Sequence, residues 1–237
     1  MPALSSPGVL ELWEKGMSLH PLDRGLLALS VADPSSAAGV ADWPLGRRNR
    51  ALLDLHASWF GPGLQGWTSC PSCGEKVEFE LDARELAMAA PGGPPDLFDA
   101  GAVIVGAYAF RLPTSRDLAH VVALDAAASA TGLLDRCRTG GPEHPEWTGD
   151  LLEAVEDGLA SADPLAETRL ALSCPSCQHE WEDAFDIGRF LWAEVESRAR
   201  RVLWEVHTLA SAYGWSESET LALGDARRAM YLEIVQA

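Results

Sequence analysis

Four of the five cysteines in this chain occur in two identical Cys-Pro-Ser-Cys turns, at residues 70–73 and 174–177. A tight Cys-x-x-Cys turn directs two thiolates and the intervening backbone amides toward one point, as in a zinc knuckle. Two such turns together make a complete tetrahedral set of sulfur ligands. We therefore predict one shared Zn²⁺ site with four ligands: Cys70, Cys73, Cys174 and Cys177. Because four protein ligands leave no position for water, the predicted role of the metal is structural.

Other uses of paired cysteines agree less well with the sequence. A thioredoxin-like motif ends a strand and begins a helix, which lowers the pKa of the first thiol, whereas strand-like alternation follows both turns here. Disulfides are typical of secreted proteins, and residues 1–8 show no basic segment followed by a long apolar one. Two separate zinc sites would need four more ligands, yet among the histidines only His179 is close to a turn. The remaining cysteine, Cys137, is predicted to be a small core residue.

The composition excludes several classes of partner. The chain has 237 residues, of which 47% are hydrophobic, and a formal charge of −17, which repels nucleic acid and anionic membranes. The longest apolar run, 100–110, is too short to span a bilayer and is predicted to be a buried strand or core segment. We expect a cytoplasmic globular protein that binds neither nucleic acid nor membranes.

No pattern in the sequence indicates an enzyme. The chain has no P-loop, no His-Glu-x-x-His zinc motif and no convincing pair of catalytic carboxylates. Glycines 61, 63 and 66 match the Gly-x-Gly-x-x-Gly spacing of dinucleotide sites, but that motif needs a strand before it and a helix after it. Here a predicted helix precedes it, so we interpret 61–66 as a turn. We expect neither catalysis nor a small-molecule substrate.

The segments around the cysteine turns are predicted to be strands. Val77, Phe79 and Leu81 alternate with charged residues, and 170–172 and 181–185 alternate similarly. The predicted fold is α+β and mainly helical, with helices around a small zinc-ribbon-like β element. Its parts are an N-terminal helical segment (1–66), a zinc-ribbon element (67–185, built from 67–81 and 168–185 with a helical insertion at 82–167) and C-terminal helices (186–237).

Helical spacing and capping residues place the helices. Apolar residues recur at helical spacing between caps or stops such as Pro7, Pro21 and Asp186. Thr114 with Asp117, and Ser216 with Glu219, have the spacing of capping boxes. The expected helices are 6–16, 20–33, 47–60, 114–124, 126–138, 151–159, 186–212, a short helix after 216 and a last one from 225.

The C-terminal helices carry aromatic and arginine side chains of the kinds that dominate binding interfaces. We predict a partner-binding surface formed by Tyr213, Trp215, Arg227, Arg228 and Tyr231. The alternative is that Trp215 and Tyr231 pack the last helices onto the core.

The C-terminal residues also carry a resemblance. The run 206–223, with its Tyr-Gly-Trp-Ser-Glu core, and the run 226–233, with Arg-Arg-Ala-Met-Tyr-Leu, resemble the phage T4-type baseplate hub assembly chaperone family. Residues 110–118, the Asp-Pro pair at 163–164, both cysteine turns and 186–192 are similar to members from contractile injection systems. The resemblance implies a non-enzymatic assembly role through binding of baseplate, hub or spike proteins. The alternative function is a zinc-ribbon adaptor or scaffold in another cytoplasmic complex.

Overall fold

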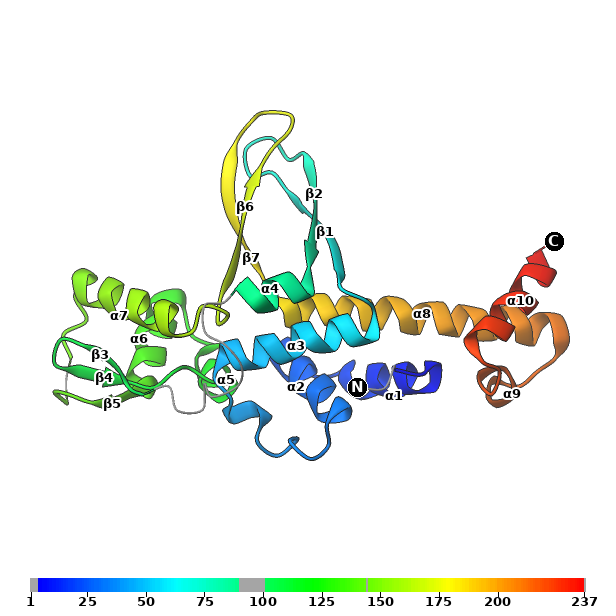
Figure 1. The fold of residues 1–237 in the computed structure, drawn as a ribbon, viewed down its shortest axis with the longest axis horizontal. Helices are drawn as coiled ribbons and strands as arrows, with labels where there is room; N and C mark the ends of the chain where they lie inside the picture. Colours follow the sequence, from blue (N-terminus) through cyan, green and yellow to red (C-terminus); the bar gives the residue numbers. More distant parts are fainter. Residues whose placement is uncertain (1–3, 90–100, 144, 237) are drawn as a thin grey trace.

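A computed structural model describes residues 4–89, 101–143 and 145–236. The molecule is elongated, with a central body of helices that carries one group of elements at each end (Figure 1). Two β-hairpins stand side by side on the central body and project away from it. The structure is therefore mixed helix and strand, with most of its regular residues in helices.

The central body contains the helices α1 (Ser6–Gly16), α2 (Pro21–Ala32), α3 (Leu45–Trp59), α4 (Ala83–Ala89) and α8 (Ile187–Tyr213), with a 3₁₀ turn η1 at Val40–Asp42. The apolar faces of α2, α3, α4 and α8 form the largest buried cluster, which includes Leu52, Leu55 and Leu191. Helix α1 packs in two smaller clusters. Helix α1 lies close against α8, since a Cβ atom on Gly16 would be 2.1 Å from the Trp192 ring. Helices α1, α2, α3 and α8 agree with the predicted ones to within about two residues, a normal uncertainty for helix ends. Helix α4 and the turn η1 were not predicted.

The two hairpins consist of β1 (Gly63–Ser69) with β2 (Lys76–Asp82), and β6 (Thr168–Ser173) with β7 (Glu180–Phe185). Both pairs are antiparallel, and the cysteine turns form their tips. The strands predicted around the turns are confirmed. The interpretation of 61–66 as a turn was wrong in part, because β1 already begins at Gly63 and Gly66 lies within it.

The insertion between the hairpins is not purely helical, in contrast to the prediction. Its helices α5 (Ser115–Val121), α6 (Ala126–Cys137) and α7 (Gly149–Ala162) accompany a three-stranded sheet of β3 (Val103–Val105), β4 (Tyr108–Phe110) and β5 (Arg138–Gly140). The apolar run 100–110, whose first residue lies outside the described residues, forms the hairpin β3–β4 because Gly106 has φ +58°. Ile104 is consequently 67% exposed. Cys137 is buried in the core of this lobe, as predicted.

The chain ends in α9 (Glu217–Leu221) and α10 (Asp225–Gln236), at the far end of α8 (Figure 1). Both predicted capping boxes are present, at Thr114 with Asp117 and at Ser216 with Glu219. Helix α8 ends at Gly214, whose left-handed φ of 70° closes it. Among the described residues, no helix has both the length and the apolar character that crossing a bilayer requires.

Candidate metal centre

The four cysteines predicted as ligands converge at the tips of the two hairpins. Their sulfur atoms all lie within 4.8 Å of one another. Two of the contacts run between the hairpins, at 3.7 Å from Cys70 to Cys177 and 3.6 Å from Cys73 to Cys174. These distances are far longer than the S–S bond of about 2 Å in a disulfide. The cluster therefore consists of four free thiols that can bind a metal ion.

The two turns have the same internal geometry. In each, the first cysteine's backbone N–H donates to the residue five positions later, and its carbonyl accepts from the residue four positions later. The residue four positions after the first cysteine has positive φ in both turns, at 77° for Gly74 and 60° for Gln178. The left-handed residue turns the chain so that the next backbone N–H, of Glu75 or His179, hydrogen-bonds to the second cysteine of its own turn.

The first thiolate that forms in the cluster is stabilised by its neighbours and opposes the ionisation of the next thiol. The backbone N–H of His179 and the neighbouring thiol of Cys73 lower the pKa of Cys177 to about 7. At Cys73 the N–H of Glu75 also acts to lower the pKa, yet its hydrogen bond with Cys177 and desolvation raise the pKa to about 12. Since the two positions are equivalent in the turns, the difference reflects which thiolate forms first. A divalent cation between the sulfurs would remove this opposition, because thiolates are the form that binds metal.

The equivalence of the hairpins extends beyond the turns. Asp82 is the last residue of β2 and accepts hydrogen bonds from the N–H groups of Arg84 and Glu85 at the start of α4. Asp186 follows β7 and accepts from Gly188 and Arg189 at the start of α8. Each hairpin is thus followed directly by a capped helix of the central body. The cysteine tips are held at a fixed distance from that body by the same local arrangement, used twice.

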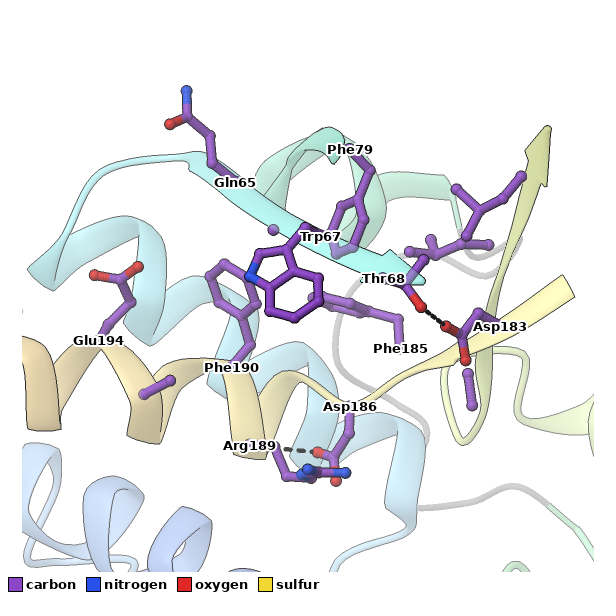
Figure 2. A pocket seen from close by; sticks show the side chains of 15 residues that line it. Gln65, Trp67, Thr68, Phe79, Asp183, Phe185, Asp186, Arg189, Phe190 and Glu194 are labelled. Atoms are coloured by element: carbon purple, nitrogen blue, oxygen red, sulfur yellow. Dashed lines mark hydrogen bonds between the residues drawn. The ribbon is translucent and has the colours of Figure 1, made fainter. Parts of the chain in front are cut away.

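Side chains between the hairpins hold them together below the cysteines. The Thr68 hydroxyl donates to the Asp183 carboxylate over 2.7 Å. Phe79 and Phe185 meet edge to face with their ring centroids 6.4 Å apart, and Phe185 in turn contacts Phe190 on α8. Figure 2 shows these residues around the space between β1, β7 and α8. The two contacts between the hairpins could not be predicted from the sequence, because each joins residues more than a hundred positions apart.

His179, the histidine nearest to a cysteine turn, is not part of the cluster. Its ring stacks on Trp181 with a centroid distance of 6.1 Å. The described residues that cluster with metal-binding geometry are the four cysteines alone.

The residues predicted to bind a partner separate into two groups. Tyr213, Trp215 and Tyr231 form an aromatic cluster at the end of α8. The ring centroid of Trp215 lies 4.7 Å from that of Tyr213 and 4.9 Å from that of Tyr231, and the two tyrosine rings are 5.7 Å apart. The three side chains are partly exposed, and Arg227 on α10 is exposed. These four residues are accessible at the end of the molecule.

Arg228 does not belong to that surface, because it is only 1% exposed. Its guanidinium donates to Glu205 over 2.7 Å, to the Ser6 hydroxyl over 2.7 Å and to Asp225 over 2.8 Å. A fourth bond reaches the carbonyl of Leu223. The prediction that Arg228 contacts a partner is therefore corrected. This side chain joins α1, α8 and α10 inside the protein.

Comparison with known proteins adds no identification to this geometry. No protein-family model, no curated protein sequence and no solved structure matches the chain.

Proposed function

We propose that the four cysteines bind one structural Zn²⁺. A regular tetrahedron with Zn–S bonds of about 2.3 Å separates its sulfurs by about 3.8 Å. Two sulfur contacts between the hairpins, at 3.6 Å and 3.7 Å, are close to that value. Thiolates are soft ligands that favour zinc over magnesium or calcium. Four thiolates complete the coordination sphere, which supports a structural and not a catalytic metal.

We further propose that the protein is a non-enzymatic, cytoplasmic assembly factor for the baseplate or hub of a contractile phage-tail-like injection system. The observation that carries this proposal is the likeness of 206–223 and 226–233 to the hub assembly chaperones. Most of the residues that carry the likeness lie at the end of α8 and on α9 and α10, where an aromatic cluster remains partly exposed. Aromatic side chains held rigidly by one another lose little entropy on binding, which suits a protein interface.

The metal is tested by elemental analysis of the purified protein. The expected result is about one zinc per chain, lost in Cys73→Ser and in Cys174→Ser. Cys137→Ala is the matched control, because it removes a thiol in the insertion and should retain the zinc. Metal-free protein from a zinc-replete preparation would refute the proposal.

The assembly role is tested by affinity purification from the native host, followed by mass spectrometry. Arg227→Glu and Tyr231→Ala should each abolish co-purification of a baseplate, hub or spike protein. Arg227 is exposed, so its replacement should leave thermal stability unchanged. Glu233→Ala is the control, since Glu233 is exposed on the same helix outside the predicted surface. Capture of an unrelated cytoplasmic complex would instead support the adaptor function.

A further inference from the structure

The two hairpins enclose an open cleft above helix α8. The cleft has a volume of about 710 Å³ and is lined by β1, by both strands of the second hairpin and by α8 (Figure 2). Its apolar walls are formed by Phe79, Leu170, Leu172, Phe185 and Phe190, none of which is fully buried. The hairpins thus present two apolar inner faces that do not fill the space between them.

Strand β1 offers an open edge at the mouth of this cleft. Its first bonds to the partner strand are made by Pro62, whose carbonyl accepts from Ala83, and its last by Cys70, whose N–H donates to Glu75. Since bonding alternates along an antiparallel pair, the even-numbered residues of β1 bond to β2 and the odd-numbered ones face away. Gln65 and Trp67 therefore direct their N–H and C=O groups outward, where the described part of the chain places no further strand.

The charge around the cleft is strongly acidic. The hairpin segments 63–82 and 168–186 carry eight acidic and only two basic side chains. Glu78 and Glu80 lie on the outer face of the first hairpin, beside the exposed Trp67. Asp183, Asp186 and Glu194 line the cleft itself, together with one cation, Arg189. A ligand that enters here meets mostly apolar side chains between the hairpins and the carboxylates of Glu78 and Glu80 on the outer face.

We propose that the cleft binds an extended segment of a partner protein in which apolar and basic residues alternate. The segment adds to the β1 edge as a third strand, with hydrogen bonds to Gln65 and Trp67. Successive side chains of a strand point to opposite faces, so the apolar set enters the cleft while the Lys or Arg set meets Glu78 and Glu80. The inference rests on the proposed function for one point, that the ligand is a protein.

The test uses end-capped, fluorescently labelled peptides and the full-length, metal-loaded protein in anisotropy titrations. An alternating Lys/Val peptide should bind at least about tenfold more tightly than a block peptide of the same composition. Methylation of alternate backbone nitrogens on its pairing edge should weaken binding by about tenfold, because it removes hydrogen bonds and adds bulk there.

The matched protein variants are Gln65→Pro and Gln65→Ala. Proline removes the outward N–H of this exposed residue and spares every backbone bond between β1 and β2. Both variants lose the 3.3 Å hydrogen bond from the Gln65 amide to the Glu80 carboxylate, so only the backbone N–H distinguishes them. With proline, affinity should fall by about tenfold while the metal content stays unchanged. Alanine should change affinity by less than about twofold, since it retains the N–H.

Three results would overturn the proposal. Equal affinity for the alternating, block and methylated peptides would mean that charge alone attracts them. Equal affinity of the two Gln65 variants would show that the β1 edge is not used. A dimer in sedimentation that Gln65→Pro dissociates would assign the edge to a second copy of this chain. The partner captured through Arg227 and Tyr231 is measured separately, so failure of either proposal is distinguishable from failure of the other.

Discussion

Replacing Arg228 by methionine should strongly destabilise the packing of α10 on α8 and α1. Methionine has a similar length but none of the donors that Arg228 directs at Glu205, Ser6 and Asp225. The change leaves the Glu205 carboxylate inside the protein, where its side chain is 7% exposed. A buried charge that has lost its partner is the costliest consequence of such a substitution.

The expected loss is about 3 kcal/mol in the free energy of unfolding. Removing one member of a buried ion pair costs about 3–5 kcal/mol. Glu205 keeps a second partner, Arg201, at 3.1 Å. The Arg201 side chain is 68% exposed, and an exposed partner contributes about 0–1 kcal/mol. Because Arg201 can offset the loss of Arg228 by about this amount, we expect a cost at the lower end of the range.

The assay is urea denaturation of four proteins in a double-mutant cycle. Arg228→Met alone should lose most of this stability, whereas Arg228→Met with Glu205→Leu should recover much of it, because no charge then remains buried. A single variant as stable as the parent would refute the assignment of Arg228 to the interior. It would also return this residue to the partner-binding surface.

Further predictions concern buried groups and the cysteine cluster. His56 makes no well-formed hydrogen bond among the described residues, although the backbone of Gly61 lies close, and burial lowers its pKa. Below pH of about 6.5 the unfolded chain therefore binds a proton at His56 that the folded chain does not bind, so the free energy of unfolding should decrease as the pH is lowered. In thermal melts of both proteins at several pH values, His56→Phe should abolish this dependence and add about 1 kcal/mol of stability. Asp117 is buried, yet bonds from Arg111 and Thr114 outweigh desolvation and hold its pKa far below the usual range. The stabilisation that the Asp117 carboxylate contributes is present above pH of about 4 and is lost as the pH falls further. Asp117→Asn should therefore destabilise the insertion at neutral pH, which hydrogen exchange would show as faster exchange of its backbone amides. Metal affinity, measured by competition with a chelator, should fall more steeply with decreasing pH below about 7 than above it, because Cys177 must then also lose a proton to bind the metal. The same slope of affinity against pH on both sides of 7 would contradict the pKa given for Cys177.

The features that sequence predicted best depend on local spacing. A Cys-x-x-Cys turn, a capping box and a run of helical periodicity each involve residues within a few positions of one another. Such signals placed the cysteine turns, the Thr114 and Ser216 caps and the long helix after Asp186 correctly. The cluster of four sulfurs was also predictable, because the repeated turn itself indicates a shared ligand set.

The errors arose where a distant partner decides the outcome. Nothing near Arg228 in the chain shows that Glu205 and Ser6 will surround it. The apolar run 100–110 resembled a buried strand, but the left-handed Gly106 divides it and one strand lies at an exposed edge. The cleft between the hairpins is invisible in sequence for the same reason, since its two walls come from segments far apart in the chain.

The position of the metal site explains why the hairpins would need it. A two-stranded hairpin is only marginally stable alone, and the buried cluster at these tips contains only Cys70, Val77 and Cys174. The main core lies in the helices below, around residues such as Leu55 and Leu191. Closing a loop of 101 residues costs about 4 kcal/mol in entropy. The helical core, the Thr68–Asp183 hydrogen bond and the Phe79–Phe185 contact offset part of this cost, but at the tips themselves only the small cluster contributes. A cation bound by the four cysteines would therefore stabilise the pairing of the hairpin tips, and with it the cleft, more than the helical body.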